Sequence, residues 1–178
     1  MSQKTKWAID PTHTEIGFKV KHMMFTNVSG KISEYEAVVE TDGDEFSNSN
    51  ISFLGDVNSI TTGNADRDTH LLSPDFFDAA QFPTMSFKAT SLSKVDGSDY
   101  ELAGDLTLHG VTNAVKLPVE YGGLMKDPWG NIKAAFNING KINRKDWGLT
   151  WNAALDAGGV LVSDEVRINA EIQLVKQN

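Results

Sequence analysis

The sequence predicts an all-β protein, built as a closed antiparallel β-barrel of about eight strands. Apolar and polar residues alternate through most of the chain; Ile16, Phe18 and Val20, for example, are separated by Gly17 and Lys19. This period of two is typical of strands with one buried face. Most connections are short and no strand is a continuous apolar run, so the pairing is expected to be antiparallel. Such a sheet either stacks on a second sheet or closes on itself. Closure removes the edges and leaves an interior that holds one small ligand.

Four strands are predicted in the N-terminal half of the chain, over residues 14–24, 30–41, 51–57 and 84–94. A turn at residues 27–30 is expected to separate the first two strands. Residues 43–50 are rich in Gly, Asp, Ser and Asn, and they are expected to form a polar loop.

Four more strands are predicted over residues 100–108, 115–121, 132–142 and 166–174. Asp96-Gly97 is a hairpin signal, and His109-Gly110 is expected to turn the chain again. The alternation stops over residues 144–163, which contain Trp147, Trp151 and a Gly-Gly pair. This stretch is expected to form an irregular loop that covers one end of the sheet.

The longest other break in the alternation, residues 61–82, is expected to contain short helical segments. Asn64 can cap a first helix that ends near Leu72, with acidic residues in its first turn where the helix dipole favours anions. Ser73-Pro74 repeats the start signal. The aromatic residues that follow are expected to be buried.

Length and composition favour one domain over residues 1–178, since all-β barrels often reach this size undivided. The net charge of −8 argues against binding nucleic acid or anionic membranes through overall charge. The absence of cysteine excludes disulfides and thiolate chemistry.

The N-terminal sequence MSQKTKWAID lacks the apolar region of a secretory signal, which favours a cytoplasmic protein. No run of about 18 apolar residues occurs, so no stable insertion into a membrane is expected.

Several short motifs, in this order and spacing, resemble the YceI-like family of isoprenoid-binding proteins. They are Trp7, Asp10, His13, Phe18, His22, Gly30, the segment Ser59 to Gly63, Arg67-Asp68, His70-Leu71, Phe76-Phe77-Asp78, Phe82-Pro83, Phe87, the segment Gly104 to Thr112, Asn143-Arg144, Asp146-Trp147-Gly148, Asp164 and Val166. The resemblance implies an extended, lipocalin-like barrel around an apolar tunnel that holds a polyisoprenoid or a long-chain lipid amide. It also implies a homodimer, since carriers of this family often pair. Many relatives carry a secretory leader and are periplasmic, and this sequence departs from them there.

Aromatic, methionine and aliphatic residues are the candidates for the wall of such a tunnel, because they bind an apolar chain without charged contacts. The expected ligand-binding residues are Phe18, Val20, His22, Met24, Phe76, Phe77, Phe82, Met85, Phe87, Leu106, Leu117, Phe136, Ile138, Trp147 and Trp151. The same residues would serve equally well as an ordinary core, and the sequence does not separate the two interpretations.

Two charged groups are open to a functional or a structural interpretation. Arg67 could meet a phosphate head group and His70 a polar one, but we favour a structural role in which Arg67 pairs with a carboxylate and His70 donates to a backbone carbonyl. Asn143, Arg144 and Asp146 are expected to form a buried ion-pair network that holds the cover loop.

The function expected from these features is the binding, sequestration or transport of a polyisoprenoid, an isoprenoid quinone or a fatty acid amide, with no chemistry and no cofactor. The four histidines lack the spacing of a metal site, and no complete catalytic motif occurs. The alternative is a metal-assisted hydrolase or isomerase that uses His22 or His70. A third interpretation is a binding or adhesion sandwich with a filled interior.

Overall fold

The computed structural model describes residues 4–156 and 158–177, which form a sheet of eleven strands with one α-helix and three short 3-10 turns. The strands are β1 (Lys4–Ile9), β2 (Glu15–His22), β3 (Thr26–Ile32), β4 (Tyr35–Asp42), β5 (Glu45–Asp56), β6 (Ile60–Thr61), β7 (Thr84–Asp96), β8 (Asp99–Leu108), β9 (Val111–Lys126), β10 (Ile132–Asn143) and β11 (Val162–Lys176). The helix is α1 (Ala65–Leu72), and the 3-10 turns are η1 (Pro11–His13), η2 (Val57–Ser59) and η3 (Arg144–Trp147).

Eight strands close into a barrel in the order β1, β4, β5, β7, β8, β9, β10 and β11, because β1 pairs with β4 on one side and with β11 on the other. Trp7 lies opposite both Val39 of β4 and Lys176 of β11. Every pairing is antiparallel. The predicted all-β, eight-stranded antiparallel barrel is confirmed.

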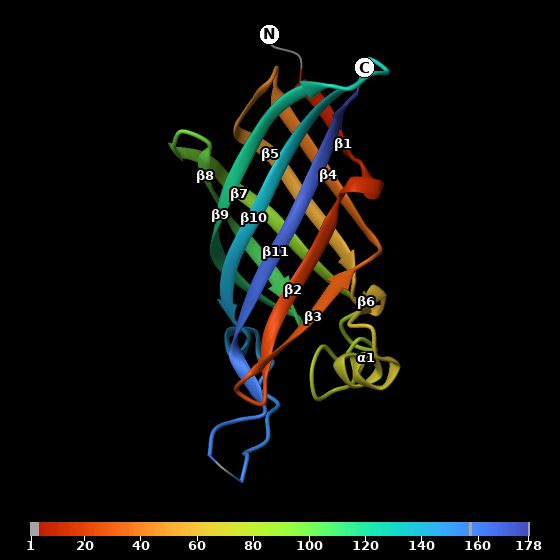
Figure 1. The fold of residues 1–178 in the computed structure, drawn as a ribbon, viewed down its shortest axis with the longest axis vertical. Helices are drawn as coiled ribbons and strands as arrows, with labels where there is room; N and C mark the ends of the chain where they lie inside the picture. The colour runs from red at the N-terminus through yellow and green to blue at the C-terminus, as the bar shows by residue number, and fades with distance from the viewer. Residues whose placement is uncertain (1–3, 157, 178) are drawn as a thin grey trace.

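The remaining strands extend the wall of the barrel at one end. β2 continues beside β11, with Val20 opposite Val166; β3 pairs with β2, and β6 pairs with β3. Helix α1 and the irregular segment between η3 and β11 lie at this same end, away from both chain termini (Figure 1). We call this end the mouth, and the end at which β11 finishes the plugged end.

Aromatic side chains fill the plugged end. Phe46 lies 5.0 Å from Trp7 and 5.0 Å from Phe136, measured between ring centroids, and Tyr121 stacks on Phe136 at 4.9 Å. The indole N–H of Trp7 donates to the hydroxyl of Thr41 at 2.9 Å, which satisfies a buried donor. This packing closes the barrel at this end.

Several predicted boundaries are wrong in the first third of the chain. β1 is missing from the prediction, and residues 27–30 lie inside β3 instead of forming a turn. The actual turn is at residues 23–25, and a second break at residues 33–34 separates β3 from β4. The expected loop 43–50 is a tight turn followed by the start of β5, where Phe46 is buried. Pairing with β4 overrides the low strand propensity of its polar residues.

The connection between β6 and β7 contains one helix, not two. The side chain of Asn64 caps α1 by accepting the N–H of Arg67, as predicted. After α1 the chain forms turns, because the N–H groups of Phe77 and Ala79 bond back to the carbonyls of Leu71 and Leu72. These bonds fold the segment against the end of α1.

Arg144 holds the irregular cover segment at the mouth. Its guanidinium is 4% exposed and donates to the carbonyls of Leu149 at 2.6 Å, Ser163 at 2.9 Å and Val162 at 3.3 Å. Asp164 lies 3.9 Å away at the edge of the site. The predicted network of ion pairs is therefore wrong, because backbone carbonyls take the place of carboxylates.

The two other members of the predicted network have different roles. Asn143 caps η3 by accepting the N–H of Lys145, and the backbone carbonyl of Asp146 accepts the side-chain amide of Asn113. These contacts fix η3 at the end of β10.

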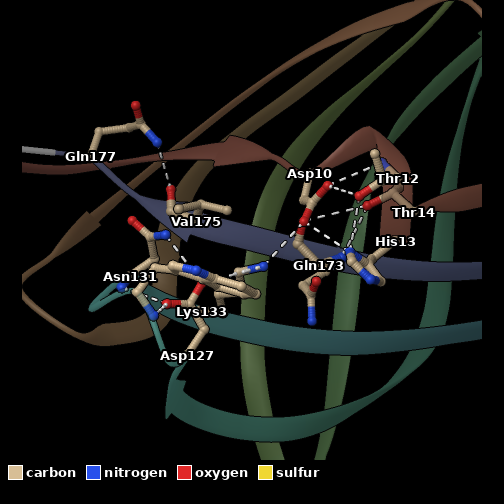
Figure 2. A network of polar contacts seen from close by, with 11 residues as sticks. Asp10, Thr12, His13, Thr14, Asp127, Asn131, Lys133, Gln173, Val175 and Gln177 are labelled. Carbon is tan, nitrogen blue, oxygen red and sulfur yellow. Dashed lines mark hydrogen bonds and ion pairs between the residues drawn. The ribbon is translucent and has the colours of Figure 1, made fainter.

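A polar network fixes the bend between β1 and β2 (Figure 2). The Asp10 carboxylate accepts the backbone N–H of Thr12 at 3.0 Å and its hydroxyl at 2.6 Å. It also lies 3.0 Å from Nδ1 of His13 and 3.3 Å from Nζ of Lys133, which is 3.8 Å from Asp127. The Thr12 hydroxyl, followed by His13, holds the pKa of Asp10 well below its usual range. The bend lets one stretch of chain close the barrel as β1 and then continue beside β11 as β2.

We expect Asp10→Ala to lower the free energy of unfolding by about 1–2 kcal/mol at pH 7, because the turn η1 loses its cap. A carboxylate with a lowered pKa stabilises the fold above the ordinary carboxyl pKa of about 4, and this contribution fades as the pH falls toward the folded value. The difference between wild type and variant should therefore shrink from pH 5 to pH 2 in urea titrations. Glu101→Ala, an exposed acid on β8, is the control. A difference that stays constant with pH would contradict this assignment.

We expect Arg144→Met to lower the free energy of unfolding by about 3 kcal/mol, because three buried carbonyls lose a charged donor. Lys145→Met is the matched control, since Lys145 is exposed and its ion pair with Asp164 contributes at most about 1 kcal/mol. Chemical denaturation measures both variants. Equal losses would show that the guanidinium does not hold the segment.

Candidate functional site

A cavity of about 430 Å³ occupies the inside of the barrel. Its wall is built from the inward positions of the strands, for example Phe18 and Val20 on β2, and Val166, Ile168 and Ala170 on β11. Inward positions recur at every second residue, so one alternating strand supplies several wall residues in a row. The cavity ends against Phe46 and Phe136, with Trp7 behind them.

Three rings stand at the mouth of the cavity. His70 of α1 lies edge-on to Trp151 at 4.8 Å and to Phe76 at 5.1 Å, and the last two rings are 5.3 Å apart. All three line the cavity, yet the His70 side chain is 40% exposed. The cavity therefore reaches solvent beside this cluster.

The charged side chains of α1 are held by local contacts. Arg67 donates to the hydroxyl of Thr62 at 2.8 Å and to its carbonyl at 2.9 Å, while His70 Nε2 lies 2.9 Å from Oδ2 of Asp75. The Thr62 hydroxyl also donates to Asp68, which lowers the pKa of that carboxyl. These contacts favour the structural interpretation of Arg67 and His70, but the predicted partners are wrong: Arg67 bonds Thr62 instead of a carboxylate, and His70 faces Asp75 instead of a backbone carbonyl.

The cavity wall carries few polar groups. Its polar and charged side chains are Lys21, His22, Ser52, Arg67, His70 and Arg144. All except Ser52 belong to elements at the mouth, and no Asp or Glu is found in the described wall. The wall is therefore suited to an apolar chain, with any polar or anionic end at the mouth.

The structure brings most of the predicted binding residues together on this wall. Those that line the cavity are Phe18, Val20, His22, Phe76, Phe77, Met85, Phe87, Leu106, Leu117, Phe136, Ile138 and Trp151. Contact between these side chains and a ligand stays a prediction.

Three predicted residues lie off the wall. Met24 is 57% exposed in the turn between β2 and β3, because this turn ends the strand alternation that placed it inward. Trp147 is buried behind the wall, and its indole donates to the carbonyl of Leu106 at 2.9 Å. Phe82 packs against His109 at 4.9 Å, outside the cavity.

The deep part of the wall lies outside the predicted set of binding residues. It includes Ile9, Phe46, Leu92, Leu102 and Leu174. Leu102 and Leu174 occupy inward positions of predicted strands, and this alternation could have identified them as wall residues. Ile9 and Phe46 lie on segments that were not predicted as strands.

The described residues offer no preformed metal centre, since no three His, Asp or Glu side chains in that part of the chain gather closely enough to hold an ion. Nor does any helix in the described ranges have the length and apolar character needed to cross a membrane.

Comparisons with known proteins agree with this architecture. UPF0312 protein SAS2572 of Staphylococcus aureus strain MSSA476 is 33% identical over 170 residues, which cover 95% of this chain and 96% of the relative. The YCEI protein of Campylobacter jejuni is 32% identical and superposes with a TM-score of 0.76 over 89% of this chain and 90% of that protein.

A domain from Saccharophagus degradans, described as a polyisoprenoid binding domain, superposes with a TM-score of 0.69 at 14% identity, covering 96% of this chain and 98% of the domain. At that identity the likeness concerns the fold alone. The model of the YceI-like domain matches residues 7–174. The resemblance read from the motifs is confirmed, and the chain belongs to the YceI-like family.

Proposed function

We propose that the chain, acting as one domain, binds a long apolar lipid inside the barrel and sequesters or carries it without chemical change. The observation that carries the proposal is the cavity of about 430 Å³, whose wall is apolar from the plugged end to the mouth. Each methylene buried there contributes about 0.8 kcal/mol, so a long tail offsets the cost of association without any charged contact.

The polar groups at the mouth suit the head of such a ligand. Lys21 and His22 are the side chains that remain to meet a polar or anionic head, since Arg67, His70 and Arg144 are engaged with Thr62, with Asp75 and with backbone carbonyls. A polyisoprenoid, an isoprenoid quinone and a fatty acid amide all combine a long apolar tail with a small polar end. The Saccharophagus degradans domain, described as polyisoprenoid binding, shares the fold and supports this choice of ligand class.

The enzymatic alternative gains no support from the geometry. His70 is positioned by Asp75 at the exposed rim, and His22 has no carboxylate beside it on the described wall. A cytoplasmic location and a homodimer stay predictions.

Extraction tests the proposal directly. We expect organic solvent to release a single class of long-chain lipid from protein purified without detergent, and mass spectrometry identifies it. If folded protein yields no long-chain lipid on extraction, the carrier hypothesis is wrong.

A variant that fills the cavity provides the matched test. Ala170 lines the cavity and is 5% exposed, so Ala170→Phe places a ring in the space for the tail. We expect at least a fivefold loss of extracted lipid, with stability lowered by no more than about 1–3 kcal/mol. Glu171→Phe adds the same ring to the outer face of β11 and should retain the lipid. Equal amounts of extracted lipid from both variants would show that the lipid does not bind inside the barrel.

A further inference from the structure

An apolar surface projects from the rim of the mouth. We call Met23, Met24 and Phe25, in the turn between β2 and β3, the apolar tip; they are 54%, 57% and 89% exposed. The N–H of Met23 donates to the carbonyl of Leu161 at 2.8 Å, which ties the tip to the cover segment. His22 before the tip and Leu161 both line the cavity, so the tip stands at its opening.

The backbone conformation of the apolar tip is strained for the residues that occupy it. Met23 and Met24 have φ values of 54° and 64°, in the left-handed region. Hairpin turns with this conformation favour Asn and Gly, because side chains with a Cβ are strained there. Folding alone therefore does not account for two methionines and an exposed phenylalanine at this turn. Local strain of this kind is typical of functional sites.

Cations gather on the outer face beside the apolar tip. In adjacent strands, Lys141 of β10 lies opposite Arg167 of β11, and Arg167 lies opposite Lys19 of β2. Lys31 extends this row on β3, and Lys21, which also lines the opening of the cavity, extends it toward the tip; all five side chains are exposed. We call them the basic face. Its positive charge contrasts with the net charge of −8 for the whole chain.

Nearby carboxylates leave most of the basic face unneutralised. Glu165 pairs with Lys141 at 3.4 Å, and Asp164 pairs with Lys145 at 3.3 Å. In the part of the chain that the structure describes, Lys19 and Arg167 have no carboxylate within ion-pair distance. Helix α1, with Asp66 and Asp68 in its first turn, lies away from β11 (Figure 1), although Asp68 accepts the N–H of Thr62, next to the residue that pairs with Lys31.

We propose that the apolar tip and the basic face together form a docking surface for an anionic lipid bilayer. Lys21 is two residues from Met23, about 7 Å along the strand, and Lys19 is about 13 Å away. With the apolar tip in the head-group layer, these cations lie in it or within about one Debye length of it. Binding is peripheral and reversible, since the tip contributes only three side chains.

A second copy of the chain fits this surface less well. Three apolar side chains fall far below the roughly 800 Å² per partner of a stable interface. Two copies that met through this surface would also bring like charges together. Lipid head groups supply both the negative charge and the soft apolar layer that the surface requires.

Docking would bring the opening of the cavity to the membrane. A lipid tail could then pass between bilayer and barrel without crossing water. This consequence rests on the proposed function, but docking itself does not, so the two can fail separately.

Vesicle flotation tests the docking surface with two compositions, pure phosphatidylcholine and phosphatidylcholine with phosphatidylglycerol. We expect wild-type protein to bind the anionic vesicles and to lose binding as salt is raised. The double variant Met24→Ser/Phe25→Ser should reduce partitioning at least tenfold. Lys19→Gln/Arg167→Gln should reduce it about twenty-five-fold, at about fivefold for each cation, and should weaken its dependence on salt.

Trp129→Ser is the matched control, because Trp129 is 83% exposed in the turn between β9 and β10, at the plugged end. It should float with the vesicles as wild type does, and urea titration checks that every variant is folded. Equal binding to both vesicle types, unchanged binding of the tip variant, or loss of binding in Trp129→Ser would overturn the proposal. So would a tip variant that converts a dimer into a monomer in sedimentation, since the tip would then bind a second copy. Lipid extraction from the wild-type protein reads the proposed function separately, because it does not depend on the vesicle assay.

Discussion

The pairing of β1 with both β4 and β11 is the constraint on which the rest of the structure depends. An open antiparallel sheet of this size would expose two edges and could bury its apolar face only by stacking on another layer. Closure satisfies the backbone groups at both edges and turns the apolar face into an interior. A strand of six residues, β1, completes this closure, and the Asp10 network sets the bend at which the chain leaves it.

The two ends of the interior differ because of side-chain volume and polarity. Phe46, Phe136, Tyr121 and Trp7 fill one end, and the single buried donor among them, the Trp7 indole, is satisfied by Thr41. At the other end Arg144 holds the cover segment by donating to three backbone carbonyls. The depth of the cavity is thus set by aromatic packing at one end. The opening of the cavity is set at the other end by the cover segment that Arg144 holds.

Alternation in the sequence was enough to predict the barrel and most of the wall, because closure makes every inward position of a strand a wall position. Prediction from alternation failed where the local sequence favours a loop but the segment pairs as a strand, or the reverse. The polar residues after Gly43 resemble a loop, yet they pair with β4 and bury Phe46. Met24 was expected on the wall as a methionine in a strand predicted to reach residue 24, but β2 ends at His22 and the chain turns there. The partners of Arg144 could not be read from the sequence, since backbone carbonyls leave no mark in it.

A wall without buried polar partners places limits on recognition. Hydrogen-bonding sites discriminate strongly because an absent partner leaves a buried group unpaired, whereas apolar pockets distinguish chains by about one methylene at a time. The tail can therefore be selected by length and bulk, but hardly by its pattern of double bonds or branches. Under the proposed function, selection by chemistry would fall to the mouth, where Lys21, His22 and Trp151 line the cavity. The proposed ligand would consequently be chosen by a few side chains at the rim, the same region that carries the apolar tip.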